Sequence, residues 1–68
     1  MLVTVNGKHR EVDGSPSLLE FLQSFDINPA LVAVEHNAEI IRRERFADLM
    51  LHDGDQLEII HMVGGGEA

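Results

Sequence analysis

The stretch LVTVNGKHREV, residues 2–12, determines how the fold begins. Residues 2–5 are apolar or β-branched, as the residues of a β-strand usually are. Asn6-Gly7 follows, and this dipeptide is a strong signal for a two-residue hairpin, because both central positions of a type I′ turn need positive φ. Residues 8–12 are mostly polar and suit a half-exposed return strand. The chain is therefore predicted to open with an antiparallel β-hairpin.

A loop and one amphipathic helix are predicted to follow the hairpin. The loop DGSPS, residues 13–17, offers two helix starts. Either Ser15 is the N-cap with Pro16 at the first helical position, or Ser17 is the N-cap and Glu20 completes a capping box. Apolar residues then recur at helical spacing and form one face, namely Leu18, Phe21, Leu22 and Phe25.

The second half of the chain is predicted to supply three more strands, at 31–36, 39–41 and 56–63. The segment 42–50 is charged and ambiguous, and we interpret it as a short irregular or 3₁₀ piece that turns Phe46, Leu49 and Met50 inward. The DGD sequence at 53–55 lacks the later ligands of a calcium loop and is interpreted as a turn. This order predicts an α+β β-grasp (ubiquitin-like) fold, with a mixed four- to five-stranded sheet and one main helix packed across it.

The composition disfavours several function classes. The 68 residues include no cysteine, which removes disulfides, thiolate nucleophiles and cysteine-ligated zinc. The net charge of −7 disfavours binding to nucleic acid or to an anionic membrane. The four histidines are scattered, so no metal site is expected, and no catalytic constellation is visible. His36 is expected on the core face of its strand. The start of the chain does not resemble a secretory signal, and a cytoplasmic location is expected.

The chain ends in three glycines followed by Glu67-Ala68. We predict a folded domain at 1–63 and a flexible glycine tail at 64–68. Glycine has no Cβ, and each extended residue adds about 3.3 Å, so the tail Gly64-Gly65-Gly66 reaches roughly 10 Å into a narrow enzyme cleft. A glycine carboxylate presented there is unobstructed and can be activated by attachment to AMP. The alternative is a frayed terminus without a role.

An apolar docking surface is predicted beside the tail. Alternation along the last strand places Leu57 and Ile59 in the core, and Ile60 and Met62 on the outer face. Leu2 points outward by the same reasoning. We therefore expect Leu2, Ile60 and Met62 to form a small exposed patch that contacts a partner. Scattered exposed apolar residues without a role are the alternative.

Three segments in combination resemble the ThiS family, the sulfur carrier proteins of thiamine biosynthesis. They are VNGK at 5–8, VAVEHNAEIIRRERF at 32–46 and DGDQLEIIHMVGGG at 53–66. The resemblance covers essentially residues 1–66, and it implies a β-grasp fold, in agreement with the order of the elements. It further implies that Gly65-Gly66 is the di-glycine end and that Gly66 bears the reactive carboxylate.

The resemblance implies a carrier that is a co-substrate and not an enzyme. A ThiF-type adenylating enzyme would use ATP and magnesium to form an acyl-adenylate on Gly66, while the carrier itself binds no cofactor. Sulfur from a cysteine-desulfurase-type persulfide would replace AMP, and the thiocarboxylate would supply a ThiG-type thiazole synthase. The family usually has an apolar residue at His36 and ends at the second glycine. Because Glu67-Ala68 covers Gly66 here, we expect a processing peptidase to remove these two residues.

Three other interpretations stay open from the sequence. The chain resembles, at its end, carriers for molybdopterin or another sulfur metabolite, although the NAEIIRRERF block at 37–46 favours ThiS. A ubiquitin-like protein modifier would share the activation chemistry and join Gly66 to a lysine. A plain interaction module would keep the fold and make no use of the tail.

Overall fold

The hairpin predicted from residues 2–12 is present. The computed structural model describes residues 1–62. In it, β1 (Leu2–Val5) pairs antiparallel with β2 (Lys8–Glu11). Asn6 and Gly7 have φ values of 50° and 82°, as the type I′ turn requires. The dipeptide therefore fixes the register of the first two strands.

The helix α1 (Leu18–Ser24) begins at Ser17 and not at Ser15. The Glu20 backbone N–H donates to the Ser17 hydroxyl at 3.1 Å, and the Ser17 N–H donates to the Glu20 carboxylate at 2.9 Å. This reciprocal pair is a capping box and satisfies two N–H groups that the first turn leaves free. The Ser15 hydroxyl instead donates to the Leu51 carbonyl at 2.7 Å.

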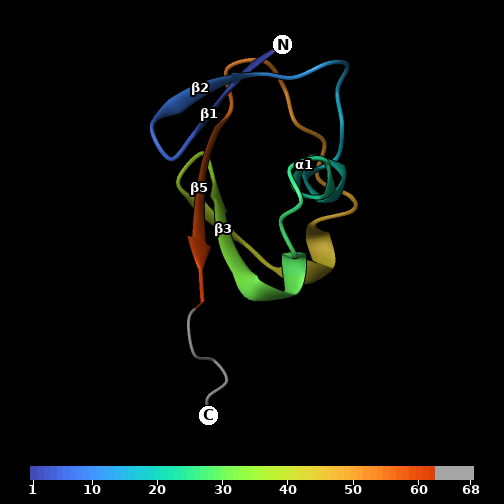
Figure 1. Cartoon of the computed structure of the whole chain (residues 1–68), viewed down its shortest axis with the longest axis vertical. Helices are drawn as coiled ribbons and strands as arrows, with labels where there is room; N and C mark the ends of the chain where they lie inside the picture. The colour runs from blue at the N-terminus through green and yellow to red at the C-terminus, as the bar shows by residue number, and fades with distance from the viewer. Residues whose placement is uncertain (63–68) are drawn as a thin grey trace.

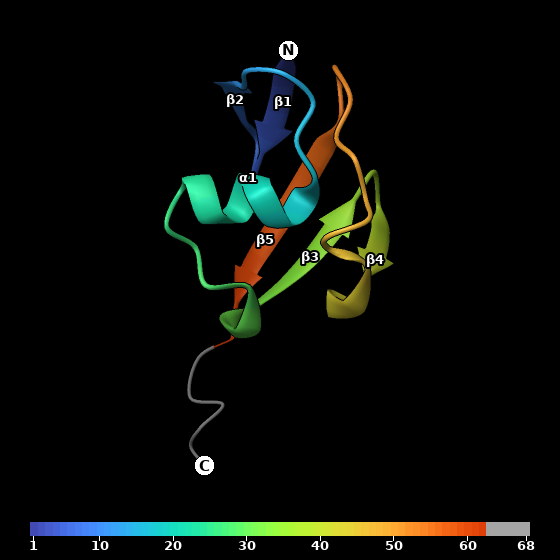
Figure 2. The same cartoon turned by 90° about the vertical axis from the view of Figure 1, so that its right-hand side faces the viewer.

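Five strands form one mixed sheet, and α1 lies across one of its faces (Figures 1 and 2). The later strands are β3 (Val32–His36), β4 (Glu39–Ile41) and β5 (Gln56–His61). The strand order is β2-β1-β5-β3-β4, in which β1 and β5 are parallel and the other pairs are antiparallel. The 3₁₀ turns Pro29–Leu31 and Arg43–Arg45 precede β3 and follow β4. The β-grasp prediction is confirmed, and β5 is its central strand.

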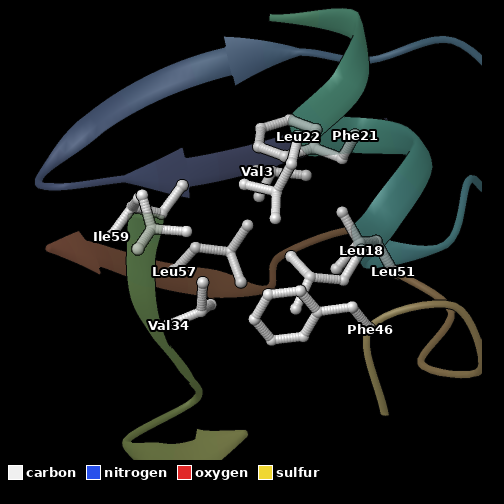
Figure 3. Close-up of a cluster of buried hydrophobic side chains, with 10 residues drawn as sticks. Val3, Leu18, Phe21, Leu22, Val34, Phe46, Leu51, Leu57 and Ile59 are labelled. Atoms are coloured by element: carbon white, nitrogen blue, oxygen red, sulfur yellow. The ribbon is translucent and has the colours of Figure 1, made fainter. Parts of the chain in front are cut away.

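The core fills the space between α1 and the sheet (Figure 3). Its ten buried apolar residues are Val3, Leu18, Phe21, Leu22, Val32, Val34, Phe46, Leu51, Leu57 and Ile59. The predictions that Leu57, Ile59 and Phe46 point inward are confirmed. Within residues 1–62, no helix has the length and apolar character needed to cross a membrane.

Two apolar residues lie outside the core, contrary to the sequence prediction. Met50 is 46% exposed because its backbone pairs in an extended bridge with Ser17, so that alternation turns Met50 outward between Leu49 and Leu51. Phe25 is the C-cap of α1 and is 41% exposed. The helix ends before Phe25 can pack inward on the face that helical spacing predicted.

The exposed Phe25 ring has contacts of its own. The Arg10 guanidinium lies 5.8 Å from the centre of the ring, within the range of a cation–π contact. The Phe21 ring is 4.7 Å away on the core side.

Candidate functional site at the end of β5

The predicted tail follows directly from the central strand of the sheet. In Figures 1 and 2, β5 runs away from the end of the molecule where the N-terminus lies. The Met62 N–H still donates to the Leu31 carbonyl at 2.9 Å. The predicted tail at 64–68, with its glycines at 64–66, lies outside the described residues, and the boundary after residue 63 stays a prediction. What the structure shows is a chain that is hydrogen-bonded to its neighbours as far as Met62.

Asn6 holds β5 in place beyond the end of β1. Its side-chain N–H donates to the Ile59 carbonyl at 3.2 Å, and its side-chain oxygen accepts from the Ile59 N–H at 2.8 Å. The last backbone partner pair between the two strands is Val5 with Leu57. The Asn6 amide therefore takes the place of one more β1 residue and continues the pairing toward the tail. The sequence did not reveal this role, because the turn alone accounts for an asparagine at this position.

Ile60 and Met62 lie at the C-terminal end of β5 and are exposed, as predicted. Their side chains are 54% and 51% exposed. Ile60 is the register partner of Ala33 on β3, and Leu31, 53% exposed, accepts the hydrogen bond from Met62. We call Leu31, Ala33, Ile60 and Met62 the exit patch. Ala33 and Ile60 belong to β3 and β5, Leu31 immediately precedes β3, and Met62 immediately follows β5, so the patch lies at the end of β5.

Leu2 does not belong to the exit patch, which corrects the sequence prediction. Its side chain is 38% exposed and points to the same face as Ile60. However, β1 runs parallel to β5, and the Leu2 carbonyl accepts from the Gly54 N–H at 2.8 Å. Ile60 is six positions further along β5, a separation of about 20 Å at 3.3 Å per residue. Alternation predicted the correct face but could not place Leu2 along the strand.

His36 is half-buried on the core side of β3, as predicted, where it contacts Asp55. Its Nε2 lies 2.8 Å from the Asp55 carboxylate, which also accepts from the His52 backbone N–H at 2.8 Å and the Asn37 side-chain N–H at 3.2 Å. Burial raises the pKa of the Asp55 carboxyl, but the hydrogen bonds from His36, from the His52 N–H and from Asn37 outweigh it and hold the pKa below its ordinary value.

The contact with Asp55 gives the partly buried ring of His36 a polar partner. The cluster joins the β3–β4 turn to the start of β5, at the end of β5 opposite the exit patch. Across residues 1–62, no group of three or more histidine, cysteine or acidic side chains is placed to hold a metal ion. We therefore interpret this cluster as structural.

The fold and the site together define a class of protein. A β-grasp domain whose central strand leads into a glycine-rich end, beside an exposed apolar patch, has the architecture of a small carrier that presents its end to other proteins. The ThiS family model matches residues 3–66, and the chain belongs to the ThiS family. The match ends at Gly66 and leaves Glu67 and Ala68 outside it.

Relatives and a solved structure agree with this membership. The sulfur carrier protein ThiS of Bacillus subtilis is 36% identical over 66 residues, which are 96% of this chain and 100% of that protein. The crystal structure of the thiamine biosynthesis protein ThiS from Geobacter metallireducens superimposes with a TM-score of 0.84 at 39% identity, over 97% of this chain and 100% of that one. The chain is thus similar over nearly its whole length to a sulfur carrier protein of the ThiS family.

The chain also resembles part of larger proteins. The thiazole synthase of Paramagnetospirillum magneticum is 35% identical over 97% of this chain, and that of Magnetococcus marinus is 30% identical over 98%. This chain spans only about a fifth of their length, 20% and 21%. A segment like the whole of this chain therefore forms part of each of those thiazole synthases.

Proposed function

We propose that this protein carries sulfur for thiazole formation in thiamine biosynthesis, as a thiocarboxylate on Gly66, in the cytoplasm. The observation that carries the proposal is the family match, which covers residues 3–66 and so ends at Gly66. Two features of the structure support it. The two hydrogen bonds between the Asn6 side chain and Ile59, and the hydrogen bond from Met62 to Leu31, hold the chain to the sheet as far as Met62. The exit patch offers a contact surface at the same end of β5.

The chemistry at Gly66 has three steps. A ThiF-type adenylating enzyme, with ATP and magnesium, joins the carboxylate to AMP and releases pyrophosphate. The terminal sulfur of a persulfide on a cysteine-desulfurase-type donor then bonds to the Gly66 carbonyl carbon, and AMP leaves. A thiol finally cleaves the resulting S–S bond, is oxidised to a disulfide, and leaves the thiocarboxylate. The part of this protein in these steps is to present the Gly66 carboxylate to the two enzymes. A glycine end suits this part because it has no side chain to obstruct either enzyme.

A thiazole synthase is the proposed acceptor of the sulfur. The synthases of P. magneticum and M. marinus include a segment similar to this chain, which places such a carrier and a synthase in one polypeptide. Linking two partners in this way raises their effective concentration and removes the need for tight binding.

Glu67-Ala68 must leave Gly66 before activation. As long as Glu67 follows, the Gly66 carbonyl belongs to a peptide bond and has no carboxylate to adenylate. We propose that a processing peptidase removes these residues. Intact-mass measurement of the protein from its native cells tests this step, and finding only chains that continue past Gly66 while sulfur transfer proceeds would exclude it.

Mass spectrometry tests the chemistry directly. The full chain and a chain ending at Gly66 are each incubated with ATP, magnesium, a thiol, and an adenylating enzyme and a persulfide donor from the same organism. We expect the chain ending at Gly66 to gain the mass of one oxygen-to-sulfur exchange, whereas the full chain stays unchanged. A chain ending at Gly65, which is one residue too short, serves as the matched control.

Two outcomes would contradict the proposal. If the chain ending at Gly66 forms no adenylate and no thiocarboxylate, the protein is not a sulfur carrier of this type. If denaturing gels of cell extract show the protein joined to other polypeptides through Gly66, the alternative of a protein modifier is favoured.

A further inference from the structure

One face of the sheet is uncovered within residues 1–62. Figure 1 shows α1 and the irregular segment 42–51 on the same side of the strands. The buried residues Val34 of β3 and Ile59 of β5 face α1, so their neighbours in each strand point the other way. The residues that β3 and β5 present on the uncovered face are Ala33, Glu35, Gln56, Glu58 and Ile60.

Two carboxylates lie side by side on this face. Glu35 of β3 is the register partner of Glu58 of β5, and partners on one face have Cβ atoms about 4.5–5.5 Å apart. The ion pairs within residues 1–62 involve other carboxylates, those of Asp55 and Glu44, so neither glutamate has a basic partner there. Like charges directly opposite each other destabilise a sheet. The free protein therefore gains no stability from keeping both charges.

Exposed apolar side chains border the two carboxylates. Ile40 of β4 is the register partner of Glu35 on its other side and is 73% exposed. Ile60 is the next outward-pointing residue along β5 after Glu58, and it belongs to the exit patch. A partner that covers these isoleucines removes water from around the carboxylates and so strengthens their attraction to a positive charge.

We propose that this face docks on the thiazole synthase that receives the tail, and that the synthase presents a positively charged side chain, preferentially arginine, to Glu35 and Glu58 together. The planar guanidinium has several donors and matches two neighbouring carboxylates better than an ammonium group does. The inference rests on the proposed function, and it adds the chemistry of the partner surface.

The length of the tail requires the enzyme that holds Gly66 to lie close to this face, and the thiazole synthases that contain a segment similar to this chain favour the synthase as that enzyme. Gly66 lies four positions beyond Met62, a span of at most about 14 Å. An enzyme whose reaction centre holds Gly66 must therefore come close to the end of β5, where the exit patch continues into the row of Ile60, Glu58 and Glu35. The net charge of −7 adds long-range attraction to a basic surface.

The test is direct binding to the thiazole synthase of the same organism, measured by calorimetry with the chain ending at Gly66 at low and moderate salt. We expect Glu58→Gln and Glu35→Gln each to weaken binding about tenfold, the effect of losing one charge-assisted contact. The double variant should lose less than the product of the two, because both carboxylates share one cation. In Glu58→Gln and in Glu35→Gln, binding should depend less on salt concentration, and the unfolding temperature should stay the same or rise.

Glu11→Gln is the matched control. Glu11 is an exposed glutamate of the edge strand β2, and as the register partner of Leu2 it lies on the same face but away from Glu35 and Glu58. This variant should bind the synthase as the unmodified chain does. It also shows whether the loss of any one negative charge is enough to weaken binding to the synthase.

The possible results separate the inference from the proposed function. Unchanged binding in Glu58→Gln and Glu35→Gln, equal weakening in Glu11→Gln, or a fall in unfolding temperature that accompanies weaker binding would each overturn the inference. So would the absence of any binding by the unmodified chain. The thiocarboxylate assay decides the proposed function separately: if that assay succeeds while the glutamate variants bind normally, only the docking inference is wrong.

Discussion

Two asparagines in hairpin turns stabilise the central strand with their side chains. Asn6 pairs with both polar backbone groups of Ile59. Asn37 acts similarly on the other side of β5: its backbone N–H donates to the Gln56 carbonyl at 2.8 Å, and its side-chain oxygen accepts from the Gln56 N–H at 2.9 Å. Each asparagine therefore has the positive φ that the turn needs and a side-chain amide that hydrogen-bonds to the backbone of β5. Glycine could supply the positive φ but not these hydrogen bonds, which explains why neither turn begins with glycine.

Replacing Asn6 tests this role. Asn6→Gly keeps the left-handed turn but removes both hydrogen bonds to Ile59, so we expect a loss of about 1–3 kcal/mol in the free energy of unfolding. Asn6→Asp still accepts from the Ile59 N–H and should lose less. Amide hydrogen exchange at Ile59 should accelerate in Asn6→Gly. If that variant retained both its stability and slow exchange, the turn alone would be what Asn6 provides.

Ala38 in the second turn has a strained backbone conformation that a glycine would relieve. Ala38 has φ of 72°, whereas the first turn has glycine at the equivalent position, Gly7, with φ of 82°. The left-handed region costs an alanine about 1–2 kcal/mol, and glycine loses part of that gain through its larger entropy when unfolded. Ala38→Gly should therefore raise the free energy of unfolding by about 0.5–1 kcal/mol, as measured by urea unfolding.

The reverse change at the first turn is the control. A Cβ at Gly7 would meet no atom within 4 Å, so only backbone strain opposes it. Gly7→Ala should lower the free energy of unfolding by a similar amount. Effects of the same sign in the two variants would contradict the explanation.

Asp55 makes stability depend on pH in acid. Its pKa in the folded protein lies below the unfolded value of about 3.9. Its contribution is therefore complete above that unfolded value and is lost as pH falls through the folded pKa. Asp55→Asn should lower the free energy of unfolding by about 1–3 kcal/mol at neutral pH. In this variant the free energy of unfolding should also fall less steeply as the pH is lowered. Urea unfolding between neutral pH and about pH 3 measures both, and an acid slope like that of the unmodified chain would assign the dependence to other groups.

At the scale of single elements, the sequence offered two N-caps and the structure selects one. The choice needs tertiary information, because Ser15 finds a partner in Leu51, which lies far away in the sequence. Ser17→Ala should lower the free energy of unfolding by about 1 kcal/mol and accelerate hydrogen exchange of the Glu20 amide. Ser15→Ala removes only the bond to Leu51 and should leave that amide protected. Faster Glu20 exchange in Ser15→Ala would contradict this assignment.

Elements with strong local signals were predicted well, and positions set by distant contacts were not. Asn6-Gly7 and the spacing of Leu18, Phe21 and Leu22 determined the hairpin and the helix. Met50 was placed wrongly because its direction depends on a bridge to Ser17, more than thirty residues earlier in the chain. Such pairing leaves no local pattern, so periodicity alone could not have predicted it.

At the scale of the whole molecule, the predicted docking surface was correct in face but not in extent. Alternation assigns each strand residue to a face, and Ile60, Met62 and Leu2 are exposed as predicted. Their mutual distance depends on the direction and register of β1 against β5, which the crossover sets. The parallel register separates Leu2 from the chain exit, and Leu31 takes a place in the patch instead.

This separation makes Ile60→Ser and Leu2→Ser a matched pair for the docking role of the exit patch. Both replace an exposed apolar residue on the same face, Ile60 at the chain exit and Leu2 about 20 Å away. A partner that receives the tail covers the exit, so Ile60→Ser should raise KM for sulfur transfer to the thiazole synthase about tenfold, as the loss of an apolar contact at the centre of an interface does. Leu2→Ser should leave KM unchanged, and circular dichroism should show both variants folded. If Leu2→Ser impaired transfer as much as Ile60→Ser, the contact would extend over the whole face, and the exit patch would not be its centre.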